Sequence, residues 1–306
     1  MGSGRLSKEE FYYPLRGIMG ITIRKLNIGV VVGAASLSQL SSVAFADGEK
    51  MSITVEGGLA SSEFTRDKLG APSDEVDSDI GLYGSVGVVR DIQPGWDWSA
   101  SASSLNFAPN TGTNAEGGGP GSDSYTNEFD ASFVNFDIGR NFDAAGAQLR
   151  IGLGIEALST SQDKGLSLFD DPESYFDSDL STSFVGLGPQ VSAQGSMALQ
   201  QGSPLSVYGG ASAALTRGVM TYDKGLIGQN PDPFGGSATE DEIANAFHGV
   251  LDAGIEYKIT DSTTFRAGVR RDIFRFDSQL AADAPDELFL DEVTSDTAYV
   301  GVSVSF

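Results

Sequence analysis

The segment Tyr299-Val300-Gly301-Val302-Ser303-Val304-Ser305-Phe306 ends the chain and decides its fold. Apolar side chains alternate with small or polar ones throughout it, and Ala298 continues the apolar set. Because successive side chains of a β-strand point to opposite faces, the pattern predicts a strand with one apolar and one polar face. Period two alone does not say which of these faces meets water.

The same alternation recurs upstream and predicts about ten strands. In one of the clearest, Leu149, Ile151, Leu153 and Ile155 oppose Arg150, Gly152, Gly154 and Glu156. The connections between strands alternate long and short without exception. The long ones are 61–78, 106–125, 160–179, 218–243 and 277–295, and the short ones are 91–94, 143–146, 200–203 and 260–262.

This alternation of lengths separates two fold classes. A soluble sandwich has connections of about 4–6 residues at both ends. Outer-membrane barrels have tight periplasmic turns and long outer loops. The sequence therefore predicts an all-β fold, a transmembrane antiparallel up-and-down β-barrel of about ten strands with short periplasmic turns and long extracellular loops. Its apolar parity faces lipid and its polar parity lines the interior.

The N-terminal region predicts export. Arg24-Lys25 precedes an apolar run at 28–35, and Ala44-Phe45-Ala46 follows. A basic region, a short apolar region and an A-x-A site are typical of a secretory signal peptide, and the run is shorter than the roughly 20 residues of a spanning helix. We expect 1–46 to comprise an N-terminal extension plus a cleaved signal peptide, and 47–306 to form the barrel.

Composition excludes several functions. The chain has 42 acidic against 19 basic residues, a formal charge of −23, and no cysteine. Such a charge repels phosphate backbones, so nucleic acid is not an expected partner. Without cysteine, the chain has no disulfide, thiolate zinc site or cysteine nucleophile. We expect no catalytic, cofactor-binding or metal-binding residues, and hence no enzyme.

Two resemblances refine the interpretation. The end of the chain resembles the C-terminal signal of bacterial outer-membrane barrels, carried by Tyr299, Gly301, Val304 and Phe306, which implies reading by the barrel-assembly machinery. Phe184-Val185-Gly186-Leu187-Gly188-Pro189, followed by the small-residue-rich stretch 204–215, resembles the Legionella-type major outer membrane protein family. This resemblance implies a pore-forming protein of the bacterial outer membrane, surrounded by outer-membrane lipid and lipopolysaccharide.

Ionisable residues on the inward parity are expected to face the barrel interior. They are Glu56, Asp137, Arg150, Glu156, Asp252, Glu256, Lys258, Arg266, Arg270 and Asp272. A hairpin around Asp261 is expected to place Ile259 opposite Phe265, and therefore Lys258 near Arg266. Diagonal neighbours would bring Glu256 to Arg266 or Arg270, and Asp252 to Arg270. These charges either set an ion preference or satisfy one another and fill the lumen.

The expected outer loops are rich in carboxylates. The clusters lie at Asp74, Glu75, Asp77 and Asp79; at Asp170, Asp171, Glu173, Asp177 and Asp179; at Glu240, Asp241 and Glu242; and at Asp283, Asp286, Glu287, Asp291 and Glu292. Carboxylate oxygens bind Ca²⁺ or Mg²⁺, but no cluster has the spacing of a dedicated calcium loop. A solvated acidic surface is the main expectation, and binding of divalent cations is the alternative.

The single histidine, His248, is expected at the outer end of its strand, next to the acidic segment 240–242. Three functions follow from these observations. The first is a narrow passive pore for ions or small polar solutes, or a structural surface protein. The second is a rim-active hydrolase using His248, and the third is a soluble secreted β-sandwich that binds a ligand.

Overall fold

The computed structural model describes residues 50–64, 79–108, 110–114, 123–144, 146–171, 174–200, 202–228, 238–277 and 292–306. The strands are β1 (Met51–Phe64), β2 (Asp79–Gln93), β3 (Trp96–Phe107), β4 (Asn110–Asn114), β5 (Asp123–Ala144), β6 (Ala147–Asp171), β7 (Ser174–Ala198), β8 (Leu205–Gly228), β9 (Ala238–Lys258), β10 (Thr263–Asp277) and β11 (Glu292–Ser305). The expected signal peptide lies outside the described residues.

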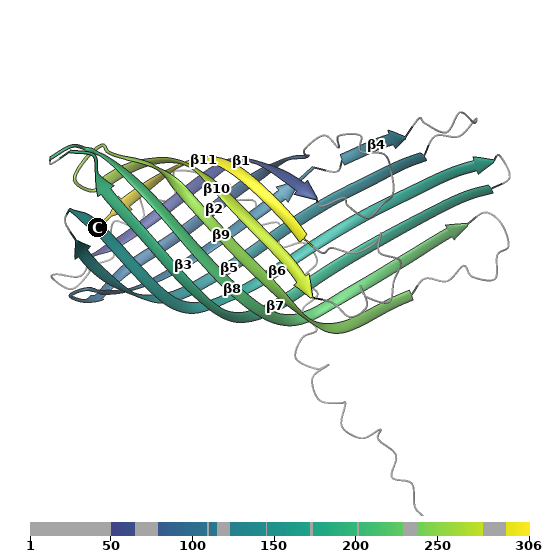
Figure 1. Ribbon diagram of the computed structural model, residues 1–306, viewed down its shortest axis with the longest axis horizontal. Helices are drawn as coiled ribbons and strands as arrows, with labels where there is room; N and C mark the ends of the chain where they lie inside the picture. The colour runs from purple at the N-terminus through teal and green to yellow at the C-terminus, as the bar shows by residue number, and fades with distance from the viewer. Residues whose placement is uncertain are drawn as a thin grey trace, which may run out of the picture. The chain divides into compact units, whose positions relative to one another are not determined.

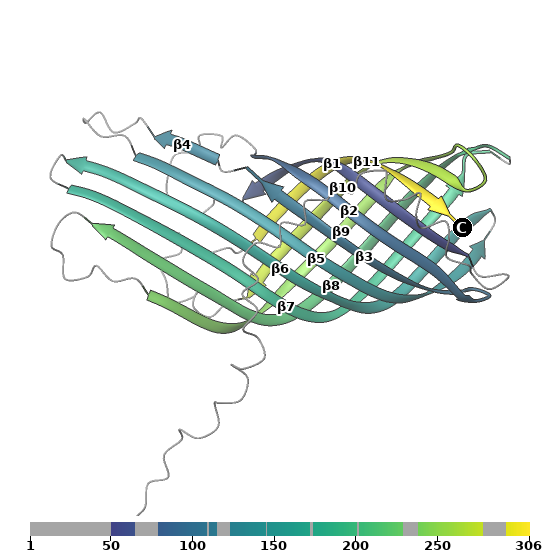
Figure 2. The same cartoon turned by 180° about the vertical axis from the view of Figure 1, so that it is seen from behind.

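Ten of these strands close into an antiparallel barrel, which confirms the predicted fold class. Sequence neighbours pair with one another, β1 pairs with β11, and β3 pairs with β5 past the short β4, which adds to the edge of β5. Figures 1 and 2 show β1 and β11 side by side, so the two ends of the barrel sequence meet. Each of the ten strands has a neighbour on both sides along its turn-end part, so closure removes the sheet edges there.

The turns at one end of the barrel are tight, and glycine makes three of them. Gly95, Gly146 and Gly202 have φ of 78°, 86° and 79°. Side chains other than glycine rarely adopt this left-handed conformation. We call this end, which also holds Lys50 and Phe306, the turn end, and the opposite end the loop end.

The prediction of a long loop at 160–179 is wrong. β6 and β7 remain paired from Ala147↔Met197 to Asp171↔Ser174, and β8 continues to Gly228. Figures 1 and 2 show β5–β8 running past the ends of β1 and β11 at the loop end. The polar composition of this stretch suggested a loop, but a continuous ladder of backbone hydrogen bonds makes it strand.

The apolar face of the strands changes sides along their length, and β5 shows the change most clearly. Phe129 and Phe133 point inward and are at most 2% exposed, whereas Val134 and Phe136 point outward and are 52% and 45% exposed. The turn-end half therefore has the inverted pattern of a membrane barrel, and the loop-end part has the pattern of a water-soluble one. This change marks the loop-side limit of the apolar belt.

The outer face of the turn-end half is a belt of exposed apolar residues. Its members include Leu59, Leu82, Ile138, Ile151, Leu153, Leu187, Val191, Leu251, Ile255, Val269, Val300 and Val302. Aromatic side chains lie at its turn-end border, where Arg140 sits over the rings of Trp96 and Phe142 at 5.6 and 5.3 Å. Interfacial aromatic girdles are typical of outer-membrane barrels. In the described part of the chain, no helix is long and apolar enough to cross a membrane.

Candidate functional site: the charged interior

The interior of the turn-end half holds three arginine-centred networks. In the first, Arg150 Nε donates to Asp97 Oδ1 at 2.8 Å, and Nη2 donates to Asp137. Asn141 Nδ2 donates to the second oxygen of Asp97 at 2.7 Å. Asp97 was not among the predicted interior charges, although its parity in the strand 95–105 could have identified it.

Glycines make room for this arginine. A Cβ at Gly139 would overlap the Arg150 guanidinium, and a Cβ at Gly152 would meet Ser192 Oγ, Asp137 Oδ1 and Arg150 Nη1. At these two positions the strands therefore present backbone without a side chain, and the guanidinium lies flat against it. The glycine-rich alternation in the sequence serves packing of the lumen here.

The second network surrounds Arg266. Its Nη1 lies 3.0 Å from Glu56 Oε1 and its Nε lies 3.1 Å from Glu256 Oε1. The guanidinium stacks over the ring of Tyr208 at 4.3 Å. Tyr299 completes the group, with its hydroxyl 2.5 Å from that of Tyr208.

The third network joins Arg270 to a buried histidine. Arg270 donates from Nε and Nη2 to Asp272 at 2.8 and 2.7 Å. Asp272 Oδ1 lies 3.1 Å from His248 Nε2, and His248 Nδ1 lies 3.0 Å from both oxygens of Glu156. The imidazole stacks on Phe274 at 4.5 Å with an interplanar angle of 3°. Charge and packing are thus combined in one buried cluster.

A polar cavity of about 350 Å³ lies between these networks. Hydroxyl groups line much of it, including those of Ser85, Ser101, Ser192 and Ser212, together with residues of the Arg150 and Arg266 networks. Arg150 Nη1, Gln190 Oε1 and Ser192 Oγ are buried without a hydrogen-bond partner. Such atoms are ordinarily satisfied by water, so the cavity fits a solvated vestibule.

A packed apolar layer fills the lumen on the loop-end side of the cavity. Its side chains are at most 2% exposed and include Leu105, Phe107, Phe129, Phe133, Leu158, Phe184, Met220, Phe274 and Val293. Their rings contact one another between the neighbouring strands β3 and β5, as in Phe107–Phe129 at 6.3 Å, and across the barrel, as in Phe129–Phe274 at 5.7 Å. The period-two pattern of the sequence does not predict this layer, because the pattern gives each whole strand a single apolar face.

The predicted hairpin register is wrong by two residues. Tyr257, and not Ile259, lies opposite Phe265, so Glu256 faces Arg266 directly. β9 ends at Lys258 and β10 begins at Thr263, so the turn has one residue more than the expected 260–262, and Ile259 N–H donates to Thr263 O at 2.9 Å within it. Lys258 consequently lies at the exposed turn, where it pairs with Asp261 at 2.8 Å. The carboxyl of Asp261 has its pKa lowered by this lysine.

One further expected contact is also absent. Asp252 is opposite Arg270 in the register, but it accepts a hydrogen bond from Tyr299 at 2.6 Å, while Arg270 binds Asp272. Arg270 and Asp272 are two residues apart on one strand, so their side chains point to the same face. Arg270 therefore binds Asp272 and not Asp252 on the neighbouring strand. The expected Glu256–Arg266 pair does form.

His248 is not at the rim, contrary to expectation. It lies midway along β9, is 0% exposed, and is enclosed by Phe133 at 4.6 Å and Phe274 at 4.5 Å. The strand continues toward the loop end for ten residues beyond it, to Ala238. A catalytic histidine needs contact with substrate, and this one contacts only interior side chains among the described residues.

The predicted acidic clusters fall mainly outside the described side chains. Of the segment 240–242, Asp241 accepts a hydrogen bond from Thr221 at 2.8 Å, and Glu242 accepts one from Tyr222 at 3.4 Å. Within the described ranges, no three acidic or histidine side chains are grouped so that they could hold a metal ion. The assembly-signal residues lie on β11 or just after it. Tyr299 and Gly301 point inward, Val304 lies on the opposite parity, and Phe306 pairs through its backbone with Met51.

Comparison with known proteins gives a family match and several similar folds. The family model for the Legionella pneumophila major outer membrane protein precursor matches residues 89–262, which confirms the predicted resemblance. No curated protein matches the chain. The outer membrane protease OmpT from Escherichia coli is 12% identical, with 86% of this chain and 99% of that chain covered and a TM-score of 0.48. A major outer membrane protein from Thermus thermophilus is 11% identical, with 85% and 100% covered and a TM-score of 0.41.

Proposed function

Because this chain belongs to the Legionella pneumophila major outer membrane protein family and forms a β-barrel of the bacterial outer membrane, we propose that it is a non-enzymatic surface protein whose lumen is closed to solutes. The observation that carries the proposal is the apolar layer, in which Phe129 on β5 meets Phe274 on β10 across the barrel and Phe133 belongs to the same buried cluster. An eight-stranded barrel is just wide enough for side chains to fill, and ten strands are only slightly wider.

Conductance across a planar bilayer tests the proposal. We expect the refolded barrel to be silent and the double variant Phe129→Ala, Phe133→Ala to conduct, because it removes two rings from the layer. Phe142→Ala is the matched control, since Phe142 is an exposed outward-facing phenylalanine. Steady conductance by the unaltered barrel would overturn the closed lumen.

That outcome would instead favour the second candidate, a narrow pore for ions or small polar solutes. The polar cavity supports it, because hydroxyl and charged groups line the lumen there. The rim hydrolase has no comparable support, since the buried His248 lacks access to substrate. A soluble sandwich is incompatible with the closed barrel and its apolar belt.

A further inference from the structure

The polar cavity in the lumen is lined unevenly, and its side along β5, β6 and β7 is rich in amide and hydroxyl groups. We call this the amide side; next to the Arg150 network it comprises Asn135, Asn141, Gln148, Gln190, Ser192, Gln194 and Ser196. Asn141, Gln148 and Gln194 are exposed although they face the interior, so the cavity is open to water at the turn end. A small solute can therefore reach the amide side from the periplasmic end of the barrel.

The amide side has hydrogen-bonding capacity that the protein itself does not use. Within the described part of the chain, Gln190 Oε1, Ser192 Oγ and Arg150 Nη1 are buried and have no hydrogen-bond partner. The three residues are 6%, 7% and 9% exposed, and all of them line the cavity. Ser192 Oγ and Arg150 Nη1 both lie against the bare Cα of Gly152, and Gln190 is two residues from Ser192 on the same face of β7. An acceptor, a hydroxyl and a donor therefore lie together on one wall of the cavity.

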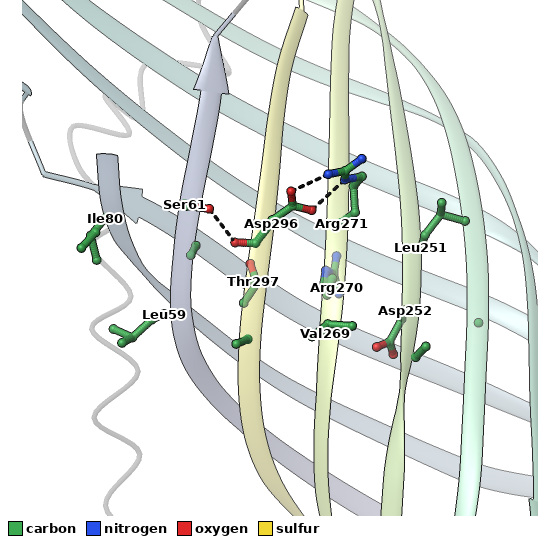
Figure 3. A pocket seen from close by; sticks show the side chains of 14 residues that line it. Leu59, Ser61, Ile80, Leu251, Asp252, Val269, Arg270, Arg271, Asp296 and Thr297 are labelled. Carbon is green, nitrogen blue, oxygen red and sulfur yellow. Dashed lines mark hydrogen bonds and ion pairs between the residues drawn. The ribbon is translucent and has the colours of Figure 1, made fainter. Parts of the chain in front are cut away.

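The charges around the cavity disfavour a charged occupant. The Arg150 and Arg266 networks each hold two carboxylates for one guanidinium. Figure 3 shows the other two charges of the lining, Asp252 on β9 and Arg270 on β10, which lie on adjacent strands and have opposite signs. An anionic ligand would therefore meet an excess of carboxylates, and a cationic ligand would meet the unpartnered Nη1 of Arg150. A neutral ligand avoids both repulsions.

We propose that the amide side of the cavity binds a small neutral polyhydroxylated solute, a mono- or disaccharide. A sugar hydroxyl both donates and accepts, so one hydroxyl can accept from Arg150 Nη1 and donate to Gln190 Oε1. Neighbouring hydroxyls of the sugar ring meet the remaining amides and serines of this side in the same way. The cavity volume of about 350 Å³ is at the small end of the range of about 300–1,000 Å³ for ligand pockets, which suits a ligand of this size.

Isothermal titration calorimetry tests the assignment. The barrel is refolded in a detergent without a sugar headgroup, which would compete, and is titrated with maltose, the diamine putrescine or inorganic phosphate. We expect saturable binding of maltose and no binding of the two charged probes. Gln190→Leu should weaken maltose binding about tenfold, because a sugar hydroxyl loses its acceptor. Ser192→Ala should weaken it by less, since the neighbouring amides remain.

Gln162→Leu is the matched control, because Gln162 is also a buried glutamine, 2% exposed, but pairs with Phe129 in the register and does not line the cavity. It should bind maltose like the unaltered barrel, and circular dichroism checks that each variant is folded. No maltose binding, or an unchanged affinity in both Gln190→Leu and Ser192→Ala, would overturn the site. Tighter binding of phosphate or putrescine would overturn the neutral class of ligand. Conductance tests the apolar layer separately, since a sugar that enters from the turn end does not need an open lumen.

Discussion

Nδ1 of His248 lies 3.0 Å from both carboxylate oxygens of Glu156, and neither side chain is more than 1% exposed. The other ring nitrogen faces Asp272. A neutral imidazole has only one N–H, so two carboxylate partners fit the doubly protonated ring. Protonation of both nitrogens lets the ring donate to both acids, in a position enclosed by the aromatic rings of the apolar layer.

Removing this imidazole should destabilise the barrel strongly. His248→Leu leaves the buried Glu156 without its cation, whereas Asp272 keeps Arg270, and breaking a buried pair in this way costs about 3–5 kcal/mol. The double variant His248→Leu, Glu156→Leu should recover part of the loss, because it also removes the stranded carboxylate. Urea unfolding in detergent or vesicles measures both. If His248→Leu costs no more than the outward control Phe247→Leu, the network is not a structural element.

The backbone contacts of the inward-facing glycines predict that substitutions at two of them differ in their cost to stability. On parity alone, Gly154→Ser would be a mild inward substitution. The structure predicts the opposite, because a Cβ at Gly154 would overlap the Phe136 backbone oxygen. Overpacking of this kind costs about 1–3 kcal/mol or more. Gly87→Ser should be mild, since its nearest contact would be 3.8 Å away. Equal stability of the two variants would contradict this packing.

The limit of the apolar belt on β6 can be mapped with arginine. Leu153 is 68% exposed on the belt. Leu153→Arg should cost roughly 2–4 kcal/mol if it lies near the bilayer midplane. Ser159 has the same outward parity but follows the change to polar residues, so Ser159→Arg should cost only about 0–1 kcal/mol. Folding titrations into lipid vesicles compare them. A larger loss at Ser159 would place the membrane further toward the loop end.

Sequence periodicity predicted the membrane half well, because every outward side chain there faces lipid and is therefore apolar or small. Leu149 through Ile155 alternate outward with Arg150 through Glu156 inward, as expected. The periodicity failed where the surroundings of the outer face change from lipid to water. There the inward Phe184 belongs to the same strand as the outward Val191. The partners of charged side chains also could not be predicted from the sequence, because they meet only in the folded barrel. His248 reaches Glu156 across the lumen, which no spacing along the chain encodes.

The export signal gives a prediction about processing. Ala44 and Ala46 supply the small residues that a signal peptidase requires, so the mature chain should begin at Asp47. N-terminal sequencing of protein isolated from the outer membrane measures this directly. An exported chain that keeps residues before Ala46 would show that the segment is an uncleaved anchor.

The opened barrel should prefer cations weakly. Its cavity is lined by the carboxylates of Glu56, Asp137, Asp252 and Glu256 and by the guanidinium groups of Arg150, Arg266 and Arg270. The excess of acids favours cations, and screening should reduce the preference as the Debye length falls from about 10 Å at 0.1 M salt to about 3 Å at 1 M. Reversal potentials of the Phe129→Ala, Phe133→Ala variant under a salt gradient measure the preference. Adding Glu256→Gln should lower it, because one lining charge is lost while the fold keeps its shape. An anion preference would mean that the three arginines control the narrowest part of the lumen.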